Sequence, residues 1–141
     1  MSEEQAAYDE VYAYTMTQGR ANFILQHVVD AHMAQTATAL TKPLGITLAL
    51  IGLYLHVEEG FSGLRVQQVH MRLGKEKRSW KTIPLPIDRG NVTTADVLAA
   101  PAGPERNAAI DAWCASVWEA YSKSTRALIV GILQQAHMPG C

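Results

Sequence analysis

The sequence contains little cysteine. Of its 141 residues only Cys114 and Cys141 are cysteines, and their spacing matches no metal or redox motif. Two such cysteines form no disulfide framework, so we expect a reducing compartment, with the cytoplasm as the default. Cys114 stands among apolar residues at helical spacing and is predicted to be a core residue rather than a nucleophile.

Long apolar segments are also missing. The longest uncharged apolar run, Pro43–Val57, has 15 residues, whereas a membrane span needs about 20. The first residues, Met-Ser-Glu-Glu-Gln, lack the basic and apolar regions of a secretory signal. We therefore expect no membrane as a partner and interpret 43–57 as a buried core helix. The sequence also has no glycine-rich phosphate loop, nucleophile elbow, zinc-finger spacing or HExxH motif.

Net charge is nearly absent, because 12 Lys and Arg oppose 13 Asp and Glu. The distribution is uneven, however: seven of the basic residues lie between Arg65 and Arg89, opposed there only by Glu76 and Asp88. This segment carries +5 and the rest of the chain −6. The simpler interpretation is a solvated loop, and the other is a site for a small anionic molecule. Trp80 lies inside the segment, but one aromatic residue and a pI of about 6.5 argue against nucleic acid as a partner.

The clearest pattern in the sequence is the helical periodicity of its apolar residues. A content of 48% hydrophobic and 18% charged residues is typical of one globular domain, here residues 1–141. The pattern predicts an all-α fold, an antiparallel bundle of four to five main helices with one short helix and no strand. The expected helices cover residues 3–17, about 21–38, 43 to about 59, 63–73, a short one after Thr93, and 104 to about 137, the last with an optional break at 122–124.

Local signals set the ends of these helices. Ser2 is predicted to cap the first helix with Gln5 as its capping-box partner, and Gly19 to end it. Ser62 and Thr93 are predicted caps, the latter with Asp96 three residues on. Residues 75–92 form a long irregular loop, because Pro84 and Pro86 exclude a helix. Ile83, Leu85 and Ile87 alternate with the two prolines, so we expect this loop to lie extended over the bundle.

The five histidines are the main candidates for a functional site. His27 and Asp30 are three residues apart and share a helix face. In the next helix a stripe of small residues, Gly45, Ala49 and Gly52, ends at His56. If the chain reverses direction at residues 39–43, the two helices are antiparallel, and the numbers of two residues that face each other add up to about 83. His27 then lies opposite His56. The same arithmetic places Glu10 or Val11 beside His27, and His70 about one turn from His56.

Four helices would thus direct a polar residue to one depth, as in metal sites of helical bundles. On this hypothesis a divalent metal (Zn, Fe, Mn or Ni) is bound by His27, His56 and His70, with Glu10 in reserve. Asp30 would orient His27 or act as a general base. In the alternative interpretation these residues form no common site. His27 is then hydrogen-bonded to Asp30 or to a tyrosine, and His56 lies at an exposed helix end near Glu58 and Glu59.

Aromatic and basic residues supply the remaining candidates. Arg65, Trp80 and Trp113 are the predicted substrate-binding residues, although Trp80 is more simply an anchor for the loop. Trp113 and Trp118 are five residues apart and cannot share a helix face, so one is assigned to the core and the other to a pocket or an interface. His32 is predicted to lie at the surface, and His137 to sit near a helix C-terminus.

Several segments, in order, resemble a bacterial family known only as a domain of unknown function: Gln26-His-Val-Val-Asp-Ala31 with Gln35, Val57-Glu-Glu-Gly60, Thr93-Thr-Ala-Asp-Val-Leu98 and Ala112-Trp-Cys-Ala-Ser-Val-Trp118. The resemblance spans about residues 8–121 and implies a small helical protein with no established activity. It also implies recurring roles for His27, Asp30, Glu58, Asp96, Trp113 and Trp118. The sequence departs from the family where many relatives have further histidines, here Thr36 and Leu48–Ala49, and in lacking an initial cysteine pair.

Two functional hypotheses follow. The first is a small-molecule enzyme or binding protein with a polar pocket around His27, Asp30, His56 and His70, for which the basic loop is a lid and an anionic molecule is the ligand. The second is a non-enzymatic helical protein that binds a partner or forms a homodimer through its helical surface and basic loop. Dimerisation that depends on Trp118 would favour the second hypothesis.

Overall fold

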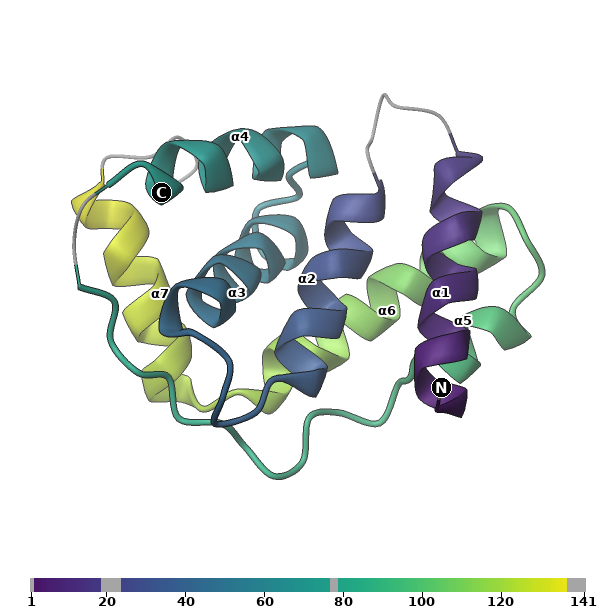
Figure 1. Cartoon of the computed structure of the whole chain (residues 1–141). Coiled ribbons are helices and arrows are strands. Elements are labelled where there is room, and N and C mark those ends of the chain that lie inside the picture. The colour runs from purple at the N-terminus through teal and green to yellow at the C-terminus, as the bar shows by residue number, and fades with distance from the viewer. Residues whose placement is uncertain (1, 19–23, 77–78, 137–141) are drawn as a thin grey trace.

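The computed structural model describes residues 2–18, 24–76 and 79–136, and this part of the chain is all-helical (Figure 1). The expected all-α class is confirmed. Within these ranges there are seven helices and no strand: α1 (Glu3–Met16), α2 (Ile24–Thr36), α3 (Pro43–Val57), α4 (Gly63–Gly74), α5 (Thr94–Ala99), α6 (Pro104–Ala120) and α7 (Lys123–Gln135).

The count exceeds the expected five or six because the last predicted helix is two. Tyr121 has extended backbone between α6 and α7, and the Ser122 side chain caps α7 by accepting a hydrogen bond from the backbone N–H of Thr125. This is the break that the sequence left open at 122–124. The predicted roles of Gly19, His137 and Cys141 lie outside the described residues.

The other predicted caps are present with one change. The side chains of Ser2, Ser62 and Thr93 each accept a hydrogen bond from the backbone N–H three residues on. Thr93 and Asp96 form the expected capping box. Gln5 does not complete a box with Ser2, because its amide instead donates to the carboxylate of Asp9, one turn further along α1.

Helix α3 occupies the centre of the fold. It packs against α2, α4, α6 and α7, so nearly every face of the helix is covered (Figure 1). This explains why Pro43–Val57 is apolar all round, since a helix enclosed by others has no solvent face. In the described ranges, no helix combines the length and the apolar character required to cross a membrane.

The irregular segment follows the edge of the fold without a helix from Ser79 to Thr93. Ile83 is buried, whereas Ile87 is fully exposed, so the alternating apolar residues cover the core only in part. Arg89 fixes the end of this segment. Its guanidinium donates hydrogen bonds of 2.6 to 3.3 Å to the backbone carbonyls of Ala34, Gln35 and Ala37 at the C-terminal end of α2. A cation in this position satisfies carbonyls that a helix end leaves free.

Candidate functional site

The two histidines predicted to face each other are in direct contact. His27 of α2 and His56 of α3 stack with ring centroids 3.5 Å apart and an angle of 15° between the ring planes. The hairpin register expected from the sequence is therefore confirmed at this level. The stacking is made possible by the close approach of α2 and α3, which is the most extensive helix pairing in the fold.

His56 is held at both ring nitrogens. Nδ1 lies 3.2 Å from the backbone carbonyl oxygen of Phe61, and Nε2 lies 2.8 Å from Oδ1 of Asp111 on α6. A carbonyl and an ionised carboxylate only accept hydrogen bonds, so His56 has an acceptor beside each of its ring nitrogens. The His56–Asp111 pair lies at the rim of the fold, because the side chain of Asp111 is 64% exposed.

His27 is in the opposite situation. Its side chain is buried, and its Nδ1 has no hydrogen-bond partner among the described residues. Burial lowers the pKa of His27 to about 3; the neighbouring His56 adds to the shift and Asp111 opposes it. A buried, neutral imidazole is therefore stacked on a ring that has a hydrogen-bond partner at both nitrogens.

The stacked pair opens onto a cleft of about 310 Å³, hereafter the histidine cleft. Its walls come from α2, the C-terminal side of α3, the start of α4, and α6. Arg65, predicted to bind substrate, lies next to it, with its guanidinium 3.8 Å from the centre of the Phe61 ring. The residues that line the histidine cleft are Ile24, His27, His56, Gly60, Phe61, Ser62, Asn107 and Asp111.

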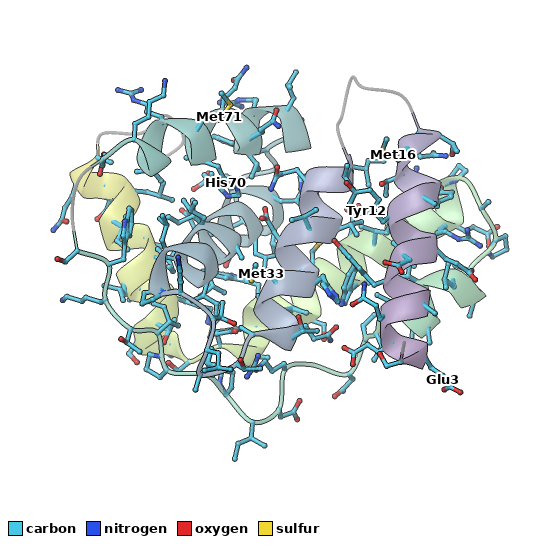
Figure 2. All side chains as sticks on the ribbon, viewed as in Figure 1. Glu3, Tyr12, Met16, Met33, His70 and Met71 are labelled. Atoms are coloured by element: carbon cyan, nitrogen blue, oxygen red, sulfur yellow. The ribbon has the colours of Figure 1, made fainter. Side chains whose placement is uncertain are left out.

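A second polar group lies one turn further along α2. Gln26 donates its side-chain amide to Oδ1 of Asp30 at 3.0 Å and lies 3.3 Å from Nδ1 of His70. Oδ2 of Asp30 and Nε2 of His70 face each other at 3.9 Å, and neither has a hydrogen-bond partner in the described part of the chain. Figure 2 shows His70 on the side of α4 that faces α3. We call Gln26, Asp30 and His70 the buried triad.

Gly52 makes room for the buried triad. A Cβ at this position would overlap the carboxylate of Asp30 and lie 3.1 Å from Nε2 of His70. Burial raises the pKa of Asp30 well above its usual range, opposed by the hydrogen bond from Gln26. Burial lowers the pKa of His70, opposed in part by the backbone of Leu48. Both shifts favour the uncharged forms, as expected for two polar groups enclosed by helices.

The proposed metal ligands do not converge in this arrangement. His27 and His56 are together, His70 belongs to the buried triad, and Glu10 is exposed on α1. Over the described ranges, no three His, Cys, Asp or Glu side chains are grouped so that they could hold a metal ion. The lone pairs of stacked rings also point in parallel directions, whereas ligands of one ion must point to a common centre. Asp30 makes no hydrogen bond to His27, so its contacts do not support the predicted orienting role.

Both tryptophans of α6 are in the core, contrary to the expectation that one of them lines a pocket or an interface. Trp113 and Trp118 are 0% and 1% exposed. The indole N–H of Trp113 donates to Oε1 of Gln35, and that of Trp118 donates to Oε2 of Glu58. Trp113 therefore does not line the histidine cleft. Cys114 is buried as predicted, and its thiol lies 3.7 Å from the backbone carbonyl oxygen of His27.

Two other expectations change. His32 is half-buried rather than exposed, because the ring of Tyr8 stacks on it at 3.6 Å. The irregular loop does not act as a lid on the histidine cleft, since none of its described residues lines that cleft, and His70 lies outside the cleft as well. Its Trp80 packs against the core, in agreement with an anchoring role.

Three residues of the two polar groups were missed by sequence reasoning. Gln26 could have been found, because it lies one helical turn before Asp30 on the same face. Asp111 and Phe61 gave no local signal. Asp111 reaches His56 across 55 residues of sequence, and Phe61 contributes only its backbone carbonyl.

The comparisons with known proteins identify a family but no activity. The model of a family of unknown function (DUF5946) matches residues 4–122, which is most of the chain. No curated protein and no solved structure matches the sequence. The family match agrees with the segments around Gln26–Ala31, Val57–Gly60, Thr93–Leu98 and Ala112–Trp118 that the sequence shares with such proteins. The chain thus belongs to the family of unknown function DUF5946.

Proposed function

We propose that the protein binds a small anionic molecule in the histidine cleft and supplies acid–base chemistry there through His56 and His27. The observation that carries the proposal is the stacked pair, whose two rings have unlike surroundings. His56 has an acceptor at each ring nitrogen, whereas burial and the adjacent ring keep His27 neutral. Neighbouring titratable groups whose environments drive their proton affinities apart are typical acid–base partners.

The surroundings of His56 favour an anion as the ligand. Nε2 of His56 already donates toward the carboxylate of Asp111, whose side chain is mostly exposed. A carboxylate or phosphate on a ligand would take the place of Asp111 with the same charge-assisted hydrogen bond. The first turn of α4, capped by Ser62, and the guanidinium of Arg65 add positive potential on the same side. In this proposal His56 is the proton donor and His27 the proton acceptor.

The test uses acetate and inorganic phosphate as probes, monitored by NMR of the histidine side chains and of the backbone amides of 60–65. Both probes are expected to shift the resonances of His56 in a saturable manner. His56→Gln is expected to abolish the response. The matched control, His32→Gln, removes a histidine that stacks on Tyr8 outside the cleft and is expected to respond like the wild type.

Asp111→Asn gives the sharper result. If Asp111 competes with the ligand for His56, this variant is expected to bind both anions more tightly than the wild type. Weaker binding by Asp111→Asn, or an unchanged response in His56→Gln, would contradict the proposal. The absence of any shift at His56 with either probe would contradict it as well.

A further inference from the structure

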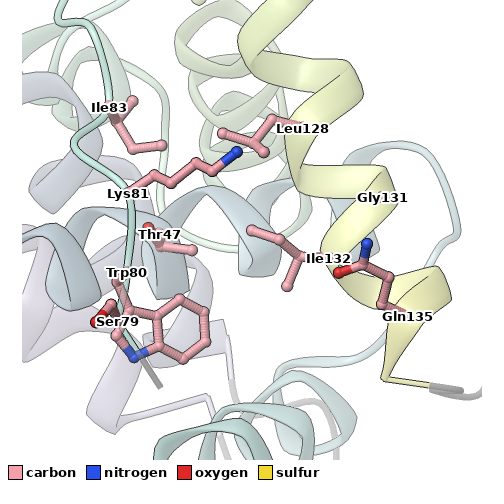
Figure 3. Close-up of a pocket in the computed structure, with 9 residues that line it drawn as sticks. All are labelled: Thr47, Ser79, Trp80, Lys81, Ile83, Leu128, Gly131, Ile132 and Gln135. Carbon is pink, nitrogen blue, oxygen red and sulfur yellow. The ribbon is translucent and has the colours of Figure 1, made fainter.

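The loop and α7 enclose a second cavity, about 200 Å³ in volume, which is unrelated to either polar group of α2. Figure 3 shows Trp80 of the loop and Ile132 of α7 pointing toward one another across it, while Lys81 extends from the loop toward Leu128. Gln135 lies at the end near the C-terminus of α7. We call this cavity the Trp80 pocket.

Gly131 is the unusual residue of the Trp80 pocket. It lies in the interior of α7, where glycine is among the least favourable residues for a helix. Packing does not require it, because a Cβ built there would meet nothing within 4 Å, and its φ is not in the left-handed region. The effect of having glycine here is that the cavity stays open on the α7 side.

The lining defines the chemistry of an occupant. The walls are the half-buried indole of Trp80 and the aliphatic side chains of Leu128 and Ile132, which suit a flat apolar body. Lys81 supplies a cation at the rim, and no described carboxylate lies within ion-pair distance of it. The volume is below the roughly 300–1,000 Å³ of sites for drug-sized ligands, so it fits a single small ring.

We propose that the Trp80 pocket binds a small aromatic carboxylate, with the ring between Trp80 and Ile132 and the carboxylate on the ammonium of Lys81. The site is separate from the histidine cleft, and this proposal stands or falls independently of the function proposed above. It also gives the basic segment of the sequence a specific anion-binding residue, Lys81.

The experiment titrates the full chain with benzoate and, as the uncharged analogue of the same shape, benzamide. Binding is followed by calorimetry and by tryptophan fluorescence, for which Trp80 is the reporter because the other two tryptophans are fully buried. Benzoate is expected to bind about two- to fivefold more tightly than benzamide, which is the range of one exposed ion pair. Equal affinities, or no binding of benzoate, would overturn the proposal.

Three variants locate the binding. Gly131→Leu is expected to fill the cavity and abolish benzoate binding, without lowering the melting temperature, because its Cβ enters open space. Lys81→Met is expected to reduce benzoate affinity about two- to fivefold and to leave benzamide unchanged. Lys42→Met, the matched control at the N-cap of α3, is expected to change neither. Full benzoate affinity in a folded Gly131→Leu variant would overturn the assignment.

Discussion

Neighbouring turns of α2 take part in two polar groups that each contain histidine, and the groups differ in what surrounds them. The buried triad lies between α2, α3 and α4, with Asp30 almost fully buried and Gly52 directly against it. The stacked pair at His27 and His56 opens onto a cleft and ends at the largely exposed Asp111. Both groups combine imidazole with carboxylate, so residue type alone does not distinguish them.

The difference shows how access determines what a polar group is able to do. In the buried triad both shifted pKa values favour neutral forms, and Oδ2 of Asp30 and Nε2 of His70 face each other in the interior of the described structure. At the histidine cleft, burial keeps His27 neutral, while His56 donates toward the exposed carboxylate of Asp111 beside an open space. We therefore propose that the buried triad specifies how the helices pack, and that the stacked pair carries the acid–base chemistry.

The largest expected effect comes from filling the space beside the buried triad. Gly52→Ala places a methyl group on the carboxylate of Asp30, and overpacking of this kind lowers the free energy of unfolding by roughly 1–3 kcal/mol. Gly131→Ala is the matched control. It adds a methyl group where nothing lies within 4 Å, and we expect it to raise the free energy of unfolding by up to about 1 kcal/mol.

Urea denaturation of both glycine variants measures these changes directly. If Gly52→Ala were as stable as the wild type while Gly131→Ala behaved as expected, the tight packing around Asp30 would be contradicted. Because the histidine cleft lies one turn away, Gly52→Ala is also expected to leave acetate binding at His56 in place.

The next effect is the dependence of stability on pH. His27 titrates near 6.5 in the unfolded chain and at about 3 in the folded one. Between these values the unfolded chain binds a proton that the folded chain does not. Stability is therefore complete above about pH 6.5 and is lost as the pH falls toward 3, by about 2 kcal/mol between pH 7 and pH 5.

Variants of the two polar groups separate their contributions to this pH dependence. His27→Gln is expected to remove most of the loss attributed to His27. The lowered pKa of His70 acts in the same direction, whereas the raised pKa of Asp30 acts in the opposite one, since its protonation stabilises the folded state as the pH falls. Asp30→Asn should therefore steepen the loss. Denaturation curves at pH 7 and pH 5 test both changes, and an unchanged pH dependence in His27→Gln would contradict the assignment.

The smallest expected effect is that of added zinc. A metal that bound only the folded protein would raise its melting temperature by mass action. Since the predicted ligands are divided between the two groups and Glu10 is exposed, we expect no change. A rise in melting temperature that is lost in His27→Gln but kept in His32→Gln would instead support the metal hypothesis drawn from the sequence.

Short-range features of the fold could be predicted from the sequence. Helix caps at Ser2, Ser62 and Thr93 depend on a few adjacent residues, so local patterns identify them. The contact between His27 and His56 was also accessible, because a short turn and the small residues of α3 fix the register of α2 against α3. The same estimate of helix register gave only the height of Glu10 and His70 along the bundle. It could not give the direction of their side chains, because that depends on how each helix is rotated about its own axis.

Long-range partners were not accessible in this way. Asp111 and Arg89 act on α2 and α3 across more than fifty residues of sequence. The residues of the recurring family pattern also fall into two groups, according to the partners that the structure gives them. Glu58 accepts a hydrogen bond from Trp118, Trp113 donates one to Gln35, and Asp96 caps a helix, so these four residues of the family pattern serve the fold. His27 alone among them lines the histidine cleft.

The central claim is that two stacked imidazoles have unlike surroundings, which keep His27 neutral and direct the Nε2 proton of His56 toward Asp111, and nitrogen NMR of the histidine side chains tests it most directly. At pH 7 we expect His27 to give the ¹⁵N shifts of a neutral tautomer and Nε2 of His56 to give the shift of a protonated nitrogen. His27 should stay neutral as the pH is lowered to 5, in agreement with its pKa of about 3. A His27 that gains a proton above pH 5, or a His56 whose Nε2 carries no proton at pH 7, would contradict the account.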